Sequence, residues 1–254
     1  MRNVEVLYKC KNILGEGITF SLEENNLFWL DIGNISKLYK LNLSTNKKEI
    51  FEIPEIITAT SIKSKNELIL ASNKGINLFN VITKKYEKIL GIEDKISYTR
   101  SNDGASDAFG RFWFGTMQNN FDENGNDIPI KDNIGKLYRI DNDKNITIVE
   151  EGLGIPNTFV WSADNTKFYF TDTLNGSILS YDFNLDKGGI KAASDCLMLV
   201  STDNSADTLR DCCDLDESHE SCQDRLSYQE FLLMYSDYKR YARLKFFRSR
   251  VSSG

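Results

Sequence analysis

The tetrapeptide Arg111-Phe112-Trp113-Phe114 decides the fold, because its pattern recurs along the chain. Matching segments centre on Trp29, Ile69 and Tyr169, so that successive copies lie 40, 44 and 56 residues apart. Each copy has the aromatic and apolar character of a β-strand. A second strand-like segment follows each copy, at residues 37–41, 77–81, 136–140 and 177–181. Strand pairs that recur in register predict a repeat architecture.

The third repeat is longer than the others for a local reason. The polar stretch at 119–127, rich in Asn, Asp and Gly, lies between its two strands and predicts a long loop. Without this insertion the period is close to 40 residues, which is the size of one four-stranded β-propeller blade. We therefore predict an all-β chain with about four propeller blades. A β-sandwich with evenly spaced strands is the alternative.

Composition and charge exclude several classes of partner. The 254 residues, 41% of them hydrophobic, suffice for a single β domain with a substantial core. A formal charge of −6 is unfavourable for binding nucleic acid or an anionic membrane. Residues 1–15 lack the apolar run of a signal peptide, and no stretch approaches the ~20 apolar residues of a spanning helix. We expect a soluble cytoplasmic protein.

The repeats stop near residue 190, where the composition changes. The segment 191–254 holds four of the five cysteines, the only histidine, an acidic block and then a basic block. A capping-box pattern begins at Ser227, and apolar residues at helical spacing predict a helix from Tyr228 to Phe247. We divide the chain into a partial propeller, 1–190, and an unrelated, mostly helical or irregular tail, 191–254.

The tail allows three further interpretations. Glu230 stands where an EF-hand loop has its bidentate glutamate, although a plain helix cap explains the same pattern. The cysteines and His219 could chelate zinc, but their spacing matches no regular zinc module, and free thiols in a reducing cytosol are the alternative. The basic helix from Lys239 could bind an anionic surface, or its charges could pair with the acidic block.

The first 218 residues contain no histidine, which excludes many catalytic and metal sites there. A Ser-His-Asp triad, a Cys-His pair and a His-liganded zinc site all need an imidazole. A metal in the repeats must therefore be held by oxygen, which suits Ca²⁺, Mg²⁺ or Mn²⁺. Glu16 would supply charge and Asn157 a neutral carbonyl. Each could singly be a turn residue, but both precede a repeated strand pattern, which favours ligation.

Several ordered motifs over residues 12–187 resemble the senescence marker protein, gluconolactonase and luciferin-regenerating enzyme family. The matching stretches are Leu14-Gly15-Glu16-Gly17, Arg100-Ser101-Asn102-Asp103-Gly104, 107–117, Gly135-Lys136-Leu137-Tyr138-Arg139, Ile155-Pro156-Asn157 and Trp161-Ser162. The resemblance implies a six-bladed propeller, one divalent cation in its central channel, and hydrolysis of sugar lactones or related esters.

The resemblance also implies roles for individual residues. Glu16 and Asn157 fall on metal-ligand positions, with Ca²⁺ as the first choice and Mg²⁺, Mn²⁺ or Zn²⁺ as alternatives. Arg100 and Asn102 fall on positions that contact a small lactone substrate. Asp103 occupies the motif's aspartate and could act as a base or brace the turn before Gly104.

The chain also departs from the family pattern. The family has two further blades and another aspartate, in a Pro-Asp-Gly turn, that binds the metal and is the expected base; no such motif follows residue 187. Asp195 or Asp203 could replace it only if the fold delivered them to the site. Thr158 stands where many members have glycine. Four blades alone would leave open sheet edges, so we expect either a truncated or chimeric product or closure by self-association.

Two functions remain open from the sequence. The first is a divalent-metal-dependent lactonase, with activity impaired by the absent blades. The cation would polarise the lactone carbonyl, a carboxylate would take a proton from water, and Arg100 with Asn102 would orient the substrate. The second is a non-catalytic propeller that binds calcium or another protein, which predicts binding without turnover.

Overall fold

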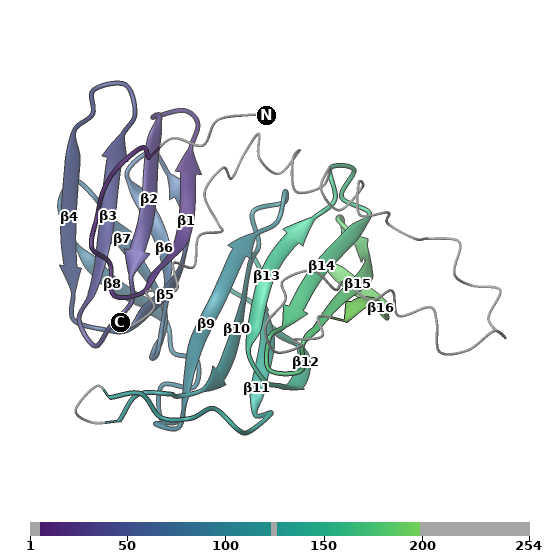
Figure 1. Cartoon of the computed structure of the whole chain (residues 1–254). Helices are drawn as coiled ribbons and strands as arrows, with labels where there is room; N and C mark the ends of the chain where they lie inside the picture. The colour runs from purple at the N-terminus through teal and green to yellow at the C-terminus, as the bar shows by residue number, and fades with distance from the viewer. Residues whose placement is uncertain (1–5, 123–125, 199–254) are drawn as a thin grey trace, which may run out of the picture.

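The computed structural model describes residues 6–122 and 126–198, which form sixteen β-strands in four antiparallel sheets. Each sheet is a blade of four strands that follow one another in the chain (Figure 1). The first two blades are β1 (Gly15–Ser21), β2 (Asn26–Asp31), β3 (Ser36–Asn42), β4 (Lys48–Ile53), and β5 (Ile57–Ser64), β6 (Glu67–Ser72), β7 (Gly75–Asn80), β8 (Tyr86–Leu90). The other two are β9 (Thr99–Ser106), β10 (Phe112–Gln118), β11 (Gly135–Ile140), β12 (Ile146–Leu153), and β13 (Pro156–Trp161), β14 (Lys167–Asp172), β15 (Ser177–Asn184), β16 (Gly189–Met198). The predicted all-β fold with four propeller blades is confirmed.

Apolar side chains between neighbouring blades form the core. The inner strands β1, β5, β9 and β13 pack against one another in chain order. Phe112 and Phe114 of β10 belong to the cluster shared with the second blade, whereas Trp113 belongs to the cluster shared with the fourth. Successive strand residues point to opposite faces, so a strand buried on both faces must be apolar at every position. This requirement explains the three consecutive aromatic residues at 112–114.

Every inner strand carries a β-bulge near its start, and these bulges set the geometry of the site. The register shifts after Glu16 in β1, after Ile57 in β5, and after Asn157 in β13. In β9 the shift follows Ser101, so Asn102 and Asp103 are the bulged residues. A bulge bends its strand and redirects the side chains beside it.

The strand register around the bulges shows that the repeats, as aligned from the sequence, are offset by one residue. The regular pairs that precede the bulges contain Leu30, Ser72, Thr116 and Thr171. The residues two positions before these, Phe28, Leu70, Phe114 and Tyr169, are therefore equivalent. The sequence had instead matched Tyr169 with Trp29, Ile69 and Trp113. The same register makes Glu16 equivalent to Asn157, as expected, and makes Ser101, not Asn102, their counterpart in the third blade. A bulged residue changes which face of the sheet the following side chains point to, but it leaves the apolar pattern of the sequence unchanged. The sequence therefore did not reveal the offset.

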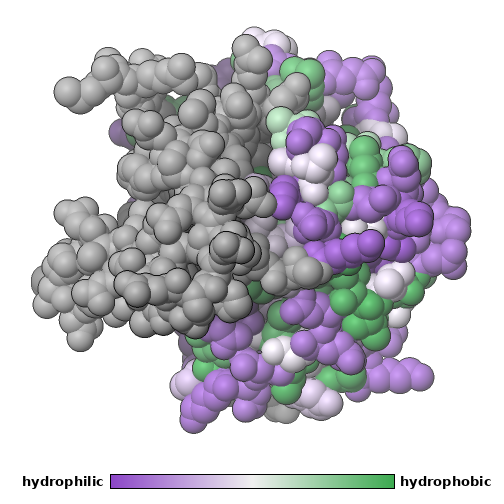
Figure 2. Space-filling view, turned by 90° about the vertical axis from the view of Figure 1, so that its right-hand side faces the viewer, coloured by the Kyte–Doolittle hydropathy of each residue, from purple (hydrophilic) through white to green (hydrophobic). Residues whose placement is uncertain are grey.

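The fourth blade continues past residue 190, because its outer strand β16 runs to Met198. The predicted boundary near 190 thus lies inside a strand. The helix predicted from Tyr228 to Phe247 and the EF-hand-like and zinc-binding interpretations fall outside the described residues. Within the described part of the chain, no helix could cross a bilayer. The coloured surface in Figure 2 is mostly hydrophilic with scattered hydrophobic residues.

Candidate functional site

Three of the predicted site residues form one hydrogen-bonded chain across the junction of the third and fourth blades. Arg100 donates from Nη1 to Asn102 Oδ1 over 3.2 Å. Asn102 Nδ2 donates in turn to Asn157 Oδ1 at 3.1 Å and to the Pro156 carbonyl at 2.8 Å. The side chain of Asn102 therefore joins the inner strand of one blade, β9, to the inner strand of the next, β13.

The amide of Asn157 is oriented from both ends. Its Nδ2 donates to Thr173 Oγ1 at 2.8 Å, while its Oδ1 accepts the bond from Asn102. An amide oxygen has two lone pairs, so one remains for a further partner. Asn157 is partly exposed, and its oxygen is fixed in direction before any ligand binds.

Arg100 is buried beneath the long loop of the third blade. Only 5% of its surface is exposed. Its Nε donates to Asn120 Oδ1 at 2.8 Å, its Nη1 donates to the Ser101 carbonyl at 2.7 Å, and the Phe121 ring lies 5.5 Å from the guanidinium carbon. Burial lowers the pKa of Arg100 to about 10, an effect that the carboxylate of Asp127 partly opposes. The guanidinium remains charged at neutral pH.

Asp103 braces the same junction. Its Oδ1 accepts the Gly104 N–H at 2.8 Å, and its Oδ2 accepts the Thr158 N–H at 3.1 Å. Thr158 has a φ of +60°, in the left-handed region that a β-branched residue adopts only under constraint. Because Asn102 and Asp103 are bulged, these consecutive side chains both reach β13, whereas in a regular strand they would point to opposite faces. These contacts support the bracing role that the sequence gave as one alternative for Asp103.

Glu16 occupies the position on β1 that Asn157 occupies on β13. It is exposed and directly precedes Gly17, whose φ of +61° matches that of Thr158. A side chain at Gly17 would come within 2.9 Å of Leu30, so both its conformation and its space require glycine. The structure thus joins Arg100, Asn102 and Asn157 directly, and it places Glu16 at the equivalent site three blades earlier along the row of inner strands.

The donor chemistry of Glu16 and Asn157 fits a hard cation, but the set is incomplete in the described residues. A carboxylate and an amide oxygen are the ligand types that Ca²⁺ and Mg²⁺ prefer, and these ions take six or more ligands. Among residues 6–122 and 126–198, no group of three His, Cys, Asp or Glu side chains gathers around one point. Asp195 lies in β16 opposite Leu179, its side chain is not described, and Asp203 is outside the described residues.

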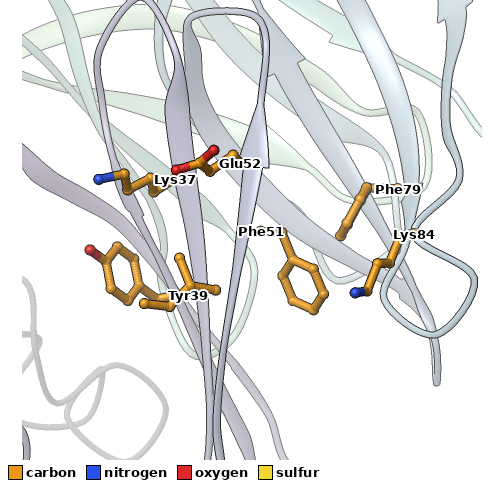
Figure 3. A pocket seen from close by; sticks show the side chains of 7 residues that line it. Lys37, Tyr39, Phe51, Glu52, Phe79 and Lys84 are labelled. Carbon is orange, nitrogen blue, oxygen red and sulfur yellow. The ribbon is translucent and has the colours of Figure 1, made fainter.

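A surface hollow of about 550 Å³ lies elsewhere, between the first two blades. Tyr39, Phe51 and Phe79 line it together with Lys37 and Lys84 (Figure 3). None of the candidate site residues contributes to its wall. Its lining also includes the carboxylate of Glu52, but no residue of the motifs that resemble the family lies there, so we place the candidate site at the blade junction and not in this hollow.

The comparison with protein families now decides the classification. The family model for the SMP-30/gluconolactonase/LRE-like region matches residues 14–222. The chain belongs to the SMP-30/gluconolactonase/LRE-like family. The resemblance predicted from the motifs at 12–187 is confirmed, and the match continues past the boundary predicted near 190.

Individual members of the SMP-30/gluconolactonase/LRE-like family are moderately similar to the chain. Pentonolactonase XacC of Haloferax volcanii is 30% identical over 179 residues, covering 70% of this chain and 56% of that protein. The 6-deoxy-6-sulfogluconolactonase of Pseudomonas putida is 27% identical, covering 70% and 57%. The crystal structure of a calcium-binding protein, regucalcin, from Agrobacterium tumefaciens superposes with a TM-score of 0.66 and 25% identity, covering 73% of this chain and 59% of that one. The matched part of the chain thus spans little more than half the length of these relatives.

Three site residues of this family member were not predicted from the sequence. Asn120 and Phe121, which hold Arg100, lie in the stretch that was identified only as a long polar loop. Thr173, which orients Asn157, follows β14 without any motif of its own. The Asn content of the loop was the available signal, because side-chain amides are able to cap buried donors.

Proposed function

We propose that this family member hydrolyses sugar lactones or closely related cyclic esters. The chain of hydrogen bonds from Arg100 through Asn102 to Asn157 carries the proposal. It brings a cationic donor, an amide and an orienting carbonyl oxygen to the start of neighbouring inner strands. The lactonases among the relatives support the reaction class.

In this proposal Arg100 and Asn102 hold the substrate. A lactone presents hydroxyl groups and a carbonyl oxygen that becomes negative during hydrolysis, and N–H donors fixed in place stabilise such a charge. Arg100 and Asn102 are fixed because each already bonds to neighbouring groups. Asp103 acts as a brace and not as the base, since backbone N–H groups occupy both of its oxygens.

Glu16 and Asn157 would contribute two oxygen ligands to a divalent cation, with Ca²⁺ as the first candidate. Such an ion, when bound, polarises a carbonyl and lowers the pKa of a coordinated water. The chain's own part is to present the Asn157 oxygen in a fixed direction through Thr173 and Asn102. Glu16 supplies the negative charge that retains the ion.

The test is acid release from an aldonolactone, measured with Ca²⁺, Mg²⁺, Mn²⁺ or Zn²⁺ and with a chelator. We expect cation-stimulated hydrolysis, and cation binding about tenfold or more weaker in Glu16→Gln and Asn157→Ala. Glu23→Gln, an exposed acid on the same blade, is the matched control and should bind the cation normally. Unchanged cation titration in both site variants would remove the metal site, and cation binding without turnover would favour the non-catalytic calcium-binding alternative.

A further inference from the structure

Arg100 is a buried cation without a carboxylate partner. Its exposed fraction is 5%, and no ion pair joins it to any described acid. Its three hydrogen bonds all go to neutral oxygens, those of Asn120, Asn102 and the Ser101 carbonyl. A charge removed from water is costly unless an opposite charge compensates it. Among the described residues, the positive charge of Arg100 is therefore opposed only through space, by the carboxylate of Asp127.

One nitrogen of this guanidinium, Nη2, remains uncommitted among the described residues. Nε and Nη1 make the three hydrogen bonds, and Nη2 makes none to the described groups. The Phe121 ring lies against the guanidinium and restricts its movement. A charged N–H donor held in this manner suits an oxygen of a carboxylate, phosphate or sulfonate.

The nearby acids do not neutralise Arg100. Asp103, three residues along β9, turns its carboxylate to Gly104 and Thr158. Asp127 lies on the exposed loop, where its field reaches Arg100 but its oxygens form no ion pair with it. An anion that reaches Nη2 would therefore meet a charged donor that no salt bridge engages.

We propose that Arg100 binds a fixed anionic group of the substrate, so that the preferred lactone carries a carboxylate, phosphate or sulfonate besides its ring ester. This inference rests on the proposed function, because it names the substrate class of the same site. It assigns Arg100 to specificity: the cation selects charged sugar lactones over neutral ones of the same size.

The kinetic test compares neutral glucono-δ-lactone with three charged lactones: glucarolactone, 6-phosphogluconolactone and its 6-sulfo analogue. A charge-assisted hydrogen bond predicts kcat/KM roughly 10- to 100-fold higher for at least one charged lactone. Arg100→Met should abolish that preference, because it should lower kcat/KM for the charged lactone by a larger factor than for the neutral one. Arg100→Lys keeps the charge but loses the planar fork, so it should retain only part of the preference. The surface variant Lys85→Met also removes one positive charge and should leave the preference intact.

A binding titration gives a second readout that does not depend on turnover. Calorimetry with glucitol, gluconate and glucitol 6-phosphate compares a neutral sugar alcohol with two anions that differ in the position of the charge. We expect glucitol 6-phosphate to bind at least about tenfold more tightly than glucitol, and Arg100→Met to remove the difference. Circular dichroism establishes that each variant is folded, and Arg100→Lys replaces Arg100→Met if the latter is not.

The outcomes separate the two proposals. Hydrolysis of neutral and charged lactones at equal rates would overturn the anion preference and leave the lactonase proposal standing. If no lactone is hydrolysed, the titration decides: an Arg100-dependent preference for glucitol 6-phosphate supports the anion site, and equal binding overturns it. Tighter binding of gluconate alone would also overturn it, because Arg100 would then recognise the carboxylate that hydrolysis releases and not a fixed group.

Discussion

Two arginines of the third blade, Arg111 and Arg100, are equally buried but have different partners. Each is 5% exposed. Arg111 donates from Nε to Asp107 Oδ2 at 2.7 Å, and the side chain of Asp107 is itself fully buried. Arg100 hydrogen-bonds only to neutral oxygens, and the carboxylate of Asp127 acts on it only through space. Burial alone therefore does not distinguish the two cations; what distinguishes them is the ion pair that Arg111 makes and that Arg100 lacks among the described residues.

Arg111 also connects the blades. Its guanidinium donates to the carbonyls of Leu185 and Asp186 in the turn between β15 and β16. Asp107 accepts further bonds from the backbone N–H groups of Phe109 and Arg111 and from Trp113 Nε1. The positive charge of Arg111 is thus used inside the fold, where it holds the fourth blade to the third.

The largest effect is expected from Arg111→Met. Removing one partner of a buried ion pair leaves the Asp107 carboxylate uncompensated, which costs about 3–5 kcal/mol of unfolding free energy. Arg100→Met removes a charge that has no such partner, so it should change the free energy of unfolding by no more than about 1 kcal/mol. Urea denaturation of both variants measures the contrast. Equal losses in the two variants would show that Arg100 is a structural cation like Arg111.

A smaller effect is expected from relieving the strain at Thr158. A left-handed backbone costs a residue with a Cβ about 1–2 kcal/mol, and the greater freedom of glycine in the unfolded chain offsets part of the gain. Thr158→Gly should therefore raise the free energy of unfolding by about 1 kcal/mol. The reciprocal change Gly17→Thr, at the equivalent bulge of the first blade, should lower it, since a side chain there meets Leu30. Thermal denaturation tests both, and destabilisation by Thr158→Gly would show that the bulge does not strain the threonine.

The fold was predictable because its signal is repeated. A strand buried on both faces needs an apolar residue at nearly every position, and four such strands with trailing partners define blades without further information. The offset between Trp29 and Tyr169 was not predictable. The offset depends on bulged residues. A bulge is a feature of backbone pairing and does not require a residue to be apolar or polar, so the apolar pattern does not reveal it.

The candidate site was predictable only in part. Glu16 and Asn157 were identified because they share a place in the repeat, and the register confirms that equivalence. The loop contacts of Arg100 could not be foreseen, since Asn120 and Phe121 reach it only through the path of a long insertion. A complete ligand set for the cation would need groups beyond those described here. The repeated sequence pattern therefore predicts which residues take equivalent positions on the strands. It does not predict loop contacts, because these depend on tertiary structure.

The most direct test of the central claim is the kcat/KM of Asn102→Ala on a simple aldonolactone. Asn102 joins Arg100 to Asn157, so its loss should lower kcat/KM about 100-fold, the cost of removing one fixed donor from a charge-stabilising site. Asn142→Ala, which removes an amide that bonds the Phe109 carbonyl in an exposed loop, should retain the full rate. An Asn102→Ala protein that is folded and fully active would contradict the assignment of the lactone site to this blade junction.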